Sequence, residues 1–262
     1  MGRLEGKVAI ITGGAGGIGA ATGQLFCEQG ARVVLVDLDT QAMASVCAEI
    51  RGKVPGAQVS DVIADVGVEG SAAQVVTEAQ RRFGRIDVLV NNAGIRSYEP
   101  LAAAKRETWE RIIAVNLLSY AYLSREALPA LRASGHGSIV NVSSMHAFIP
   151  RAGMGQYDVT KSGIVSMTRT LAFEEARHGV RVNAVCPGAT LTPFHEKRFA
   201  AAGQTRVAID AIAARSCLLR RWATPREMAY PILWLASGEA SYMTGAALMI
   251  DGGGLMPQPE TV

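Results

Sequence analysis

The sequence predicts an α/β fold in which one parallel sheet is covered by helices on both faces, the doubly wound arrangement. Short runs rich in Val and Ile alternate with longer helical patterns along the chain. These runs are almost continuously apolar, as strands buried on both faces must be. No low-complexity linker or internal repeat divides the 262 residues. We therefore expect a single domain over 1–262.

Seven segments are predicted to be strands because each is a short β-branched run bounded by turn residues. They are 8–11, 32–36, 59–64, 88–90, 138–142, 180–185 and 247–250. Helical patterns fill the gaps between them. The predicted helices are 17–28, 41–51, 71–83, 106–132, 156–177 and 226–236. Gly30, Gly84 and Gly179 follow three of these helices, where a left-handed residue often ends a helix.

One segment breaks the alternation. Residues 191–221 are helical in composition, rich in Ala and Arg with Lys197 and His195 among them, and follow the sixth predicted strand. Doubly wound sheets bind ligands outside the carboxyl ends of their strands. We therefore predict that this insertion is a substrate lid; the alternative interpretation is a plain surface excursion.

Composition and charge exclude several classes of protein. The formal net charge is only +3, and no block of Lys and Arg indicates a nucleic-acid or membrane-surface partner. No apolar run reaches the ~18 residues of a membrane span, and Arg3, Glu5 and Lys7 do not fit a signal peptide. Four widely spaced cysteines predict neither a zinc site nor a disulfide framework. We expect a cytoplasmic protein without nucleic-acid or membrane partners.

A glycine-rich turn joins the first predicted strand to a helix. It has the sequence Thr12-Gly13-Gly14-Ala15-Gly16-Gly17-Ile18-Gly19, with the spacing T-G-x-x-x-G-x-G. Glycines permit a tight turn and let the backbone approach a pyrophosphate, at which the free N–H groups of the helix point. The common dinucleotide fingerprint is spaced differently, as G-x-G-x-x-G. In this strand–turn–helix context, the turn nevertheless predicts a dinucleotide site.

Asp37 ends the second predicted strand, eighteen positions after Gly19. A carboxylate there can accept hydrogen bonds from the adenosine ribose and would repel a 2′-phosphate. The glycine turn carries no Arg or Lys to hold such a phosphate. NAD is therefore predicted in preference to NADP. The alternative is that Asp37, like Asp39, is only a turn residue.

Tyr157 and Lys161 lie four positions apart on one predicted helix, and Ser144 lies thirteen positions before Tyr157. Residues four apart stack one turn above the other. An ammonium about 4 Å away, at an effective dielectric near ~20, would lower the phenol pKa by up to about three units. Such a phenol can take the proton of an alcohol as a hydride departs. The alternative is a solvated helix face, against which the glycine turn argues.

These motifs and several others resemble the short-chain dehydrogenase/reductase family over essentially the whole chain. The others are Asn91-Asn92-Ala93-Gly94, Asn116 within Val-Asn-Leu, Asn141-Val142-Ser143-Ser144, Pro187-Gly188 with Thr192, and Asp251-Gly252-Gly253. The resemblance implies a Rossmann-like domain with a seven-stranded parallel sheet. It also implies a nicotinamide cofactor, no metal and a homotetramer that uses the two long helices and the last strand as interfaces.

By that resemblance the catalytic residues are Asn116, Ser144, Tyr157 and Lys161. Tyr157 would be the base in alcohol oxidation and the acid in carbonyl reduction, and Ser144 would hydrogen-bond the substrate oxygen. Lys161 would tune Tyr157 and hold the nicotinamide ribose, and Asn116 would kink its helix and anchor a water chain. Ser143 is expected to be structural. The implied cofactor-binding residues are Gly13, Ala15, Gly16, Gly17, Ile18, Gly19, Asp37, Leu38, Asp65, Val66, Asn92, Ala93, Gly94, Tyr157, Lys161, Pro187, Gly188, Thr190 and Thr192.

The expected substrate pocket lies after the fourth, fifth and sixth strands. There Arg96, His146, Arg151 and His195 are candidate contacts, and their charges suit a hydroxylated substrate carrying a carboxylate or sulfonate. The alternative is that the lid charges face solvent and Arg96 lies at the rim. The chain departs from the family pattern at three places, which affect the expected shape of the pocket. They are Ala147, the segment Asp158-Val159-Thr160, and Thr190.

The predicted function is oxidation of a secondary alcohol, such as a sugar, polyol or hydroxy acid, with NAD. A carbonyl reductase such as a 3-oxoacyl reductase is the enzymatic alternative. Asp37 argues against it, because biosynthetic reductases usually draw on NADPH. The alternative of another class is a cofactor-binding regulator without catalysis, against which the intact set of catalytic residues argues.

Overall fold

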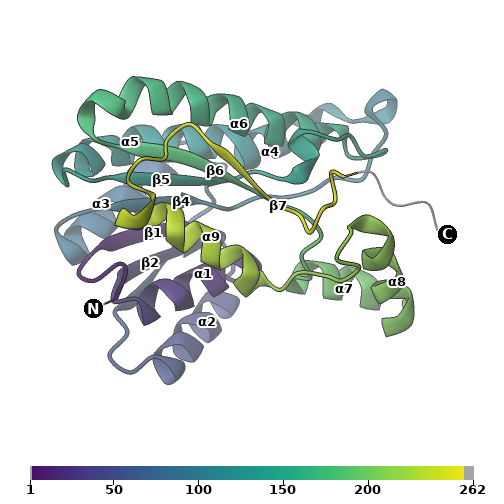
Figure 1. Ribbon diagram of the computed structural model, residues 1–262, viewed down its shortest axis with the longest axis horizontal. Helices are drawn as coiled ribbons and strands as arrows, with labels where there is room; N and C mark the ends of the chain where they lie inside the picture. The colour runs from purple at the N-terminus through teal and green to yellow at the C-terminus, as the bar shows by residue number, and fades with distance from the viewer. Residues whose placement is uncertain (1, 257–262) are drawn as a thin grey trace.

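The structure, a computed structural model, describes residues 2–256. Within that range seven strands form one sheet in the order β3-β2-β1-β4-β5-β6-β7, and each neighbouring pair is parallel (Figure 1). The strands are β1 (Val8–Thr12), β2 (Arg32–Asp37), β3 (Val59–Ile63), β4 (Val88–Asn91), β5 (Ser138–Val142), β6 (Arg181–Pro187) and β7 (Ala247–Ile250). The predicted doubly wound fold is confirmed, and each predicted strand boundary lies within two residues of the observed one.

Helices cover both faces of the sheet (Figure 1). Helices α1, α2 and α9 pack on one face, where Phe26 and Ile232 lie in one buried core with Ile11 of β1. Helices α3, α5 and α6 pack on the other face, where Val75 lies in a second core with Ile10. Neighbouring strand residues point to opposite faces, so Ile10 and Ile11 anchor different layers. The helices are α1 (Gly17–Glu28), α2 (Thr40–Lys53), α3 (Ser71–Phe83), α4 (Arg106–Ile113), α5 (Ser119–Ala133), α6 (Gly155–Glu175), α7 (Pro193–Ala201), α8 (Arg206–Ser216) and α9 (Pro225–Ala236).

The long helix expected over 106–132 is divided in the structure. A π-helical turn, Ala114–Leu118, separates α4 from α5 without interrupting the helical path. Single π-helical turns of this kind often occur at functional sites, and Asn116 lies within this one. The predicted ends of three other helices are confirmed, because Gly30, Gly84 and Gly179 have φ values of 84°, 74° and 72°.

The carboxyl ends of the strands converge on one edge of the sheet. From β1 the chain winds outward through β2 and β3, then crosses to β4 on the other side of β1. Loops after β1 and β4 therefore diverge, which leaves a crevice between them. Helices α7 and α8 stand beyond this edge (Figure 1) and make up most of 191–221, the segment predicted to be a lid.

The cysteines and the helix lengths give two further observations. Cys27, Cys47, Cys186 and Cys217 are all buried and free. Burial raises the pKa of the Cys27 thiol to about 12, so this group is a protonated core side chain near neutral pH. Among the helices of residues 2–256, none is both long and apolar enough to cross a membrane.

Candidate active site

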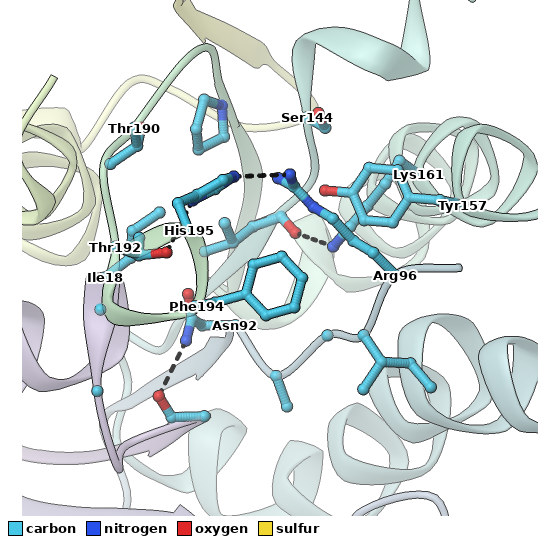
Figure 2. A pocket seen from close by; sticks show the side chains of 18 of the residues that line it. Ile18, Asn92, Arg96, Ser144, Tyr157, Lys161, Thr190, Thr192, Phe194 and His195 are labelled. Atoms are coloured by element: carbon cyan, nitrogen blue, oxygen red, sulfur yellow. Dashed lines mark hydrogen bonds between the residues drawn. The ribbon is translucent and has the colours of Figure 1, made fainter. Parts of the chain in front are cut away.

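A cavity of about 510 Å³ opens at the crevice between the loops that follow β1 and β4. Figure 2 shows a close view of a pocket that contains the glycine-turn residue Ile18 as well as Ser144, Tyr157 and Lys161. The strand ends, α1 and α6 therefore contribute to one site. The cavity is lined by Gly13, Gly16, Gly17, Ile18, Asp37, Asn92, Ala93, Gly94, Ile95, Arg96, Val142, Ser143, Ser144, Tyr157, Lys161, Pro187, Gly188, Thr190, Thr192, Pro193, Phe194 and His195.

The glycine turn gives the cavity a floor of bare backbone. A β-carbon on Gly19 would stand 2.0 Å from the Gly13 carbonyl oxygen, so only glycine allows this close approach. A β-carbon on Gly16 would meet nothing nearer than Pro193, at 3.9 Å, because that side is open. No side chain caps α1 at Gly16, and its first turn carries no acidic residue. The uncapped N–H groups at the helix start fit a pyrophosphate.

Asp37 is fixed beside this turn by three backbone hydrogen bonds. Its Oδ2 accepts from Ala15 N at 3.0 Å, and its Oδ1 accepts from Leu38 N at 2.8 Å and from Asp39 N at 3.4 Å. The carboxylate lines the cavity. A carboxylate held in this way presents its remaining lone pairs to a ligand hydroxyl, which fits a ribose.

The loop after β4 is tied to the end of β1 and closes one wall. Thr12 Oγ1 accepts from the backbone N–H groups of Asn92 at 2.9 Å and Ala93 at 3.0 Å. The Asn92 side chain donates in return to the carbonyl oxygens of Thr12 at 2.9 Å and Gly13 at 3.3 Å. These reciprocal bonds fix the width of the crevice.

Tyr157 and Lys161 of α6 lie in the cavity wall, both almost completely buried. Lys161 Nζ lies 5.5 Å from the centroid of the Tyr157 ring and donates to Val142 O at 2.8 Å. Ser144 lies two residues after the end of β5, and its Oγ accepts a hydrogen bond from His146 N at 3.1 Å. Ser143 Oγ instead donates to Lys161 O at 2.7 Å, so it joins β5 to α6. The two serines therefore differ in their hydrogen bonds, since Ser143 is held by the main chain of α6.

The pKa of the Tyr157 phenol lies below its ordinary value. Burial raises this pKa, but the positive charges of Lys161 and Arg96, with hydrogen bonds from Ser144 and Arg96, outweigh it. Burial lowers the pKa of Lys161, and the neighbouring phenol opposes this while Arg96 adds to it. Lys161 therefore lowers the pKa of Tyr157, as the spacing of the two residues predicts, and Arg96 is a second cation that lowers it.

Asn116 is fully buried in the π-helical turn. Its Oδ1 accepts from Ile95 N at 2.8 Å, and its Nδ2 donates to Ile95 O at 2.9 Å and to Thr160 Oγ1 at 3.3 Å. The side chain thus clamps the loop after β4 to α6. A β-carbon on Gly94 would stand 3.5 Å from both Asn116 Oδ1 and Lys161 Nζ, so this glycine brings the loop close to both groups.

Arg96 lies between Tyr157 and His195 (Figure 2). Its guanidinium carbon is 5.0 Å from the centroid of the Tyr157 ring, and its Nη1 is 3.0 Å from His195 Nε2. Because an arginine can only donate, Nε2 must accept. The proton then resides on His195 Nδ1, which donates to Thr192 Oγ1 at 3.0 Å. Burial, followed by the charges of Arg96, Arg198 and Arg151, lowers the pKa of His195 to about 4, so the ring is neutral near pH 7.

A second cavity, of about 460 Å³, adjoins the first. Both are lined by Ser144, Arg96 and His195, among other residues. The second cavity also contains His146 and Arg151, so the structure brings together all four candidate substrate residues. Its further lining residues are Met145, Ile149, Pro187, Gly188, Ala189, Thr190, Arg198, Phe199, Gln204, Ile212, Arg215, Ser216, Trp222 and Gly254.

Some expected site residues do not line either cavity. Leu38 is 60% exposed. The Asp65 carboxylate forms an ion pair with Arg111 at 2.8 Å and accepts a hydrogen bond from Gly67 N at 2.9 Å. The expected residues outside both linings are Ala15, Gly19, Leu38, Asp65, Val66 and Asn116. Within the part of the chain that the structure describes, no three His, Cys, Asp or Glu residues are grouped to hold a metal ion.

Several lining residues were not among the sequence candidates. Phe199 follows His195 at helical spacing, a signal that could have placed the two near one another. No such pattern in the sequence places Arg215 and Trp222 at the cavity, because their positions depend on where α8 lies in the fold. Trp222 Nε1 donates to Ile209 O at 2.9 Å, which ties the segment after α8 to that helix.

Known proteins resemble this chain over nearly its whole length. A family model described as "Enoyl-(Acyl carrier protein) reductase" matches residues 13–254. The chain is 41% identical to the 3-oxoacyl-[acyl-carrier-protein] reductase FabG of Thermotoga maritima, over 96% of this chain and 98% of that protein. It is 39% identical to cis-4-hydroxycyclohexanecarboxylate dehydrogenase of Sinomonas cyclohexanicum, over 94% of this chain and 96% of that protein.

A solved structure shares both the fold and its extent. The L-sorbose reductase of Gluconobacter frateurii, complexed with NADPH and L-sorbose, superposes with a TM-score of 0.92 at 32% identity and covers 97% of this chain and 98% of that one. The chain belongs to the short-chain dehydrogenase/reductase family.

Proposed function

We propose that the protein oxidises a secondary alcohol to a ketone with NAD as the hydride acceptor. Family membership makes it an oxidoreductase acting on alcohol and carbonyl groups. The observation that carries the proposal is Tyr157, whose buried phenol has a lowered pKa and faces the cavity that holds the glycine turn. A base that titrates closer to neutrality, beside a fitting cofactor site, is what alcohol oxidation requires.

The side chains divide the proton chemistry among them. In oxidation, Ser144 would hold the substrate hydroxyl, and Tyr157 would accept its proton as a tyrosinate, the form that the charges of Lys161 and Arg96 stabilise beforehand. In reduction, Tyr157 returns that proton to the carbonyl oxygen. Asn116 would anchor the waters through which Lys161 exchanges protons with solvent. When bound, the cofactor supplies the nicotinamide ring that accepts or returns the hydride.

The preference for NAD over NADP rests on Asp37. Its carboxylate lines the cavity beside the glycine turn, and its charge disfavours a 2′-phosphate. The arginine and the lysine that line this cavity, Arg96 and Lys161, are placed against Tyr157 instead. The related L-sorbose reductase was solved with NADPH, so the comparison of kcat/KM for NAD and NADP is a direct test.

A second candidate function is reduction of a 3-oxoacyl thioester. The 41% identity to FabG of Thermotoga maritima favours it. Tyr157 serves either direction, so the cofactor decides between the two functions. A preference for NADPH together with turnover of acetoacetyl thioesters would favour this candidate.

We also propose that the protein is a homotetramer. The resemblance to the family suggests this assembly, and helix α6 presents two apolar side chains that a partner would cover, Val159, 53% exposed, and Phe173, 89% exposed. The interfaces would use α5, α6 and β7. Light scattering coupled to size exclusion should give about four times the 27.6 kDa chain mass, and a mass near one chain would refute the assembly.

We place the protein in the cytoplasm. Four free, buried thiols suit a compartment in which cysteines stay reduced. Fractionation of the native host with an antibody against the chain tests this placement.

The function is tested by following NADH absorbance. NAD is supplied with matched neutral and acidic sugars, polyols and hydroxy acids, and Tyr157→Phe is the control. Turnover that disappears in the variant supports the proposal. Absence of turnover across the panel, while NADH still binds, would instead require a test of reductase substrates.

A further inference from the structure

The second cavity lies directly against the proposed catalytic groups. It shares Ser144, Arg96 and His195 with the first cavity. A substrate whose hydroxyl reaches Ser144 and Tyr157 therefore has the rest of its atoms available to fill this second space. The chemistry of that space should match the part of the substrate that does not react.

Arginines dominate the charge of this cavity. Arg96, Arg151, Arg198 and Arg215 line it, and its described lining contains no Asp or Glu. Within residues 2–256, none of the four lies within 4.0 Å of a side-chain carboxylate. The nearby carboxylate of Asp158 accepts the backbone N–H of Arg151 at 3.0 Å and does not line the cavity. The cluster thus has an excess of positive charge.

The excess of positive charge affects the protonation of His195, which packs among aromatic rings. The pKa of His195 is lowered to about 4 by burial and then by Arg96, Arg198 and Arg151. The same ring packs 5.6 Å from Trp222 and 6.2 Å from Phe199, measured between centroids. Neutral His195 therefore joins an apolar wall, while the arginines supply the charge.

Further apolar side chains line the cavity. Met145, Ile149 and Ile212 do so as well as the two aromatic rings. A sugar would leave this wall without apolar partners, whereas a hydrocarbon ring or chain would be desolvated against it. Apolar walls with a few convergent charged groups are typical of sites that bind small organic anions.

We propose that the second cavity is the anion subsite of this enzyme, and that its substrate is a hydroxy compound with an oxyanion, a carboxylate, sulfonate or phosphate, on a compact apolar skeleton. The proposal deepens and rests on the proposed alcohol oxidation. Arg198 of α7 and Arg215 of α8 hold the oxyanion, and Trp222 and Phe199 pack on the skeleton. Arginine suits this task because its planar fork matches an oxyanion.

Binding of inert ligands tests the subsite without turnover. Four compounds share one skeleton and lack the reacting hydroxyl: cyclohexanecarboxylate, cyclohexanesulfonate, cyclohexyl phosphate and the uncharged cyclohexanecarboxamide. Calorimetric titration into the enzyme saturated with NADH should show the tightest anion binding about 100-fold more strongly than the amide. The anion that binds most tightly identifies the oxyanion class. Equal binding of amide and anions would overturn the proposal.

Two variants and a matched control locate the charge. Arg198→Gln and Arg215→Gln should each weaken anion binding about fivefold, and the double variant about 25-fold. Amide binding should not change. Arg206→Gln is the control, because Arg206 is also on α8 but pairs with Asp210 at 2.9 Å and lines neither cavity. An equal loss in Arg206→Gln would show a general effect of net charge and refute the subsite.

The two proposals fail in different ways. If the enzyme turns over neutral alcohols with NAD and ignores the anion series, the subsite is wrong while the function stands. If the anions bind through Arg198 and Arg215 but no alcohol is oxidised, the subsite stands and the function is wrong.

Discussion

The two cavities that meet at Ser144 are built from different parts of the chain. The first has a floor of glycine backbone and a carboxylate fixed by main-chain N–H groups, all at the ends of adjacent strands. The second is built from side chains of loops and of α7 and α8. This difference separates a site that the sheet itself defines from one that can vary without altering the sheet.

Tyr157 lines the first cavity, and its loss should have the largest effect. Tyr157→Phe removes the oxygen that exchanges the proton but keeps the ring beside Lys161. We expect kcat to fall by about 10²-fold or more while the NADH dissociation constant stays within about twofold. Stopped-flow turnover and fluorescence titration measure the two quantities. Near-normal turnover would remove Tyr157 from the mechanism.

Arg96 couples the second cavity to the chemistry of the first, and its effect should come next. Its charge lowers the pKa of Tyr157, and oxidation needs the tyrosinate. In Arg96→Met the pKa of Tyr157 should be higher. The pH at which kcat/KM for oxidation increases should therefore shift upward by about one pH unit, so that kcat/KM on the acid side falls about tenfold. Reduction needs the protonated phenol and should extend to higher pH.

Oxidation should become slower at low pH while reduction should become faster at high pH, and these opposite changes in rate make the test specific. Simple damage to the pocket would lower both rates at every pH without displacing either profile. In Arg96→Lys, which keeps a positive charge, the profiles should be displaced less than in Arg96→Met. Unchanged profiles in Arg96→Met would show that Lys161 alone sets the pKa of Tyr157.

The contrast between the cavities also explains what the sequence could predict. The glycine turn, Asp37 and the pair Tyr157 and Lys161 could be placed because each lies within one strand–turn–helix unit or one helix turn. The parallel sheet then brings the strand ends together. The resemblance to a known family added Ser144 and Asn116.

The remaining features depend on packing that no local pattern encodes. Arg215 lines the second cavity only through the placement of α8 in the fold, and Trp222 follows α8 in the chain. The π-helical turn around Asn116 was expected only as a kink. The contact of the Asp65 carboxylate with Arg111, at 2.8 Å, also follows no local pattern.

Asp37 tests whether the first cavity alone selects the cofactor. Removing its charge in Asp37→Ala should relieve repulsion of the 2′-phosphate and remove an acceptor for the ribose. We expect the ratio of kcat/KM for NAD over NADP to fall about fivefold to tenfold. Asp39→Ala is the matched control, because Asp39 caps α2 through Ala42 N at 2.9 Å and lies outside the cavity. An unchanged ratio in Asp37→Ala would assign the preference to another residue.

Replacement of Lys197 should have the smallest effect of these variants. It compares two neighbouring cations of α7, one that lines the second cavity and one that does not. Lys197 is an exposed cation next to Arg198 in sequence, yet it lines neither cavity, whereas Arg198 lines the second. Position on the helix rather than charge alone should then decide which residue matters. Lys197→Gln should leave KM for an anionic substrate within about twofold, as expected for a solvated charge. A rise in KM as large as that of Arg198→Gln would mean that α7 acts through its total charge, and that the lining of the second cavity does not select the substrate.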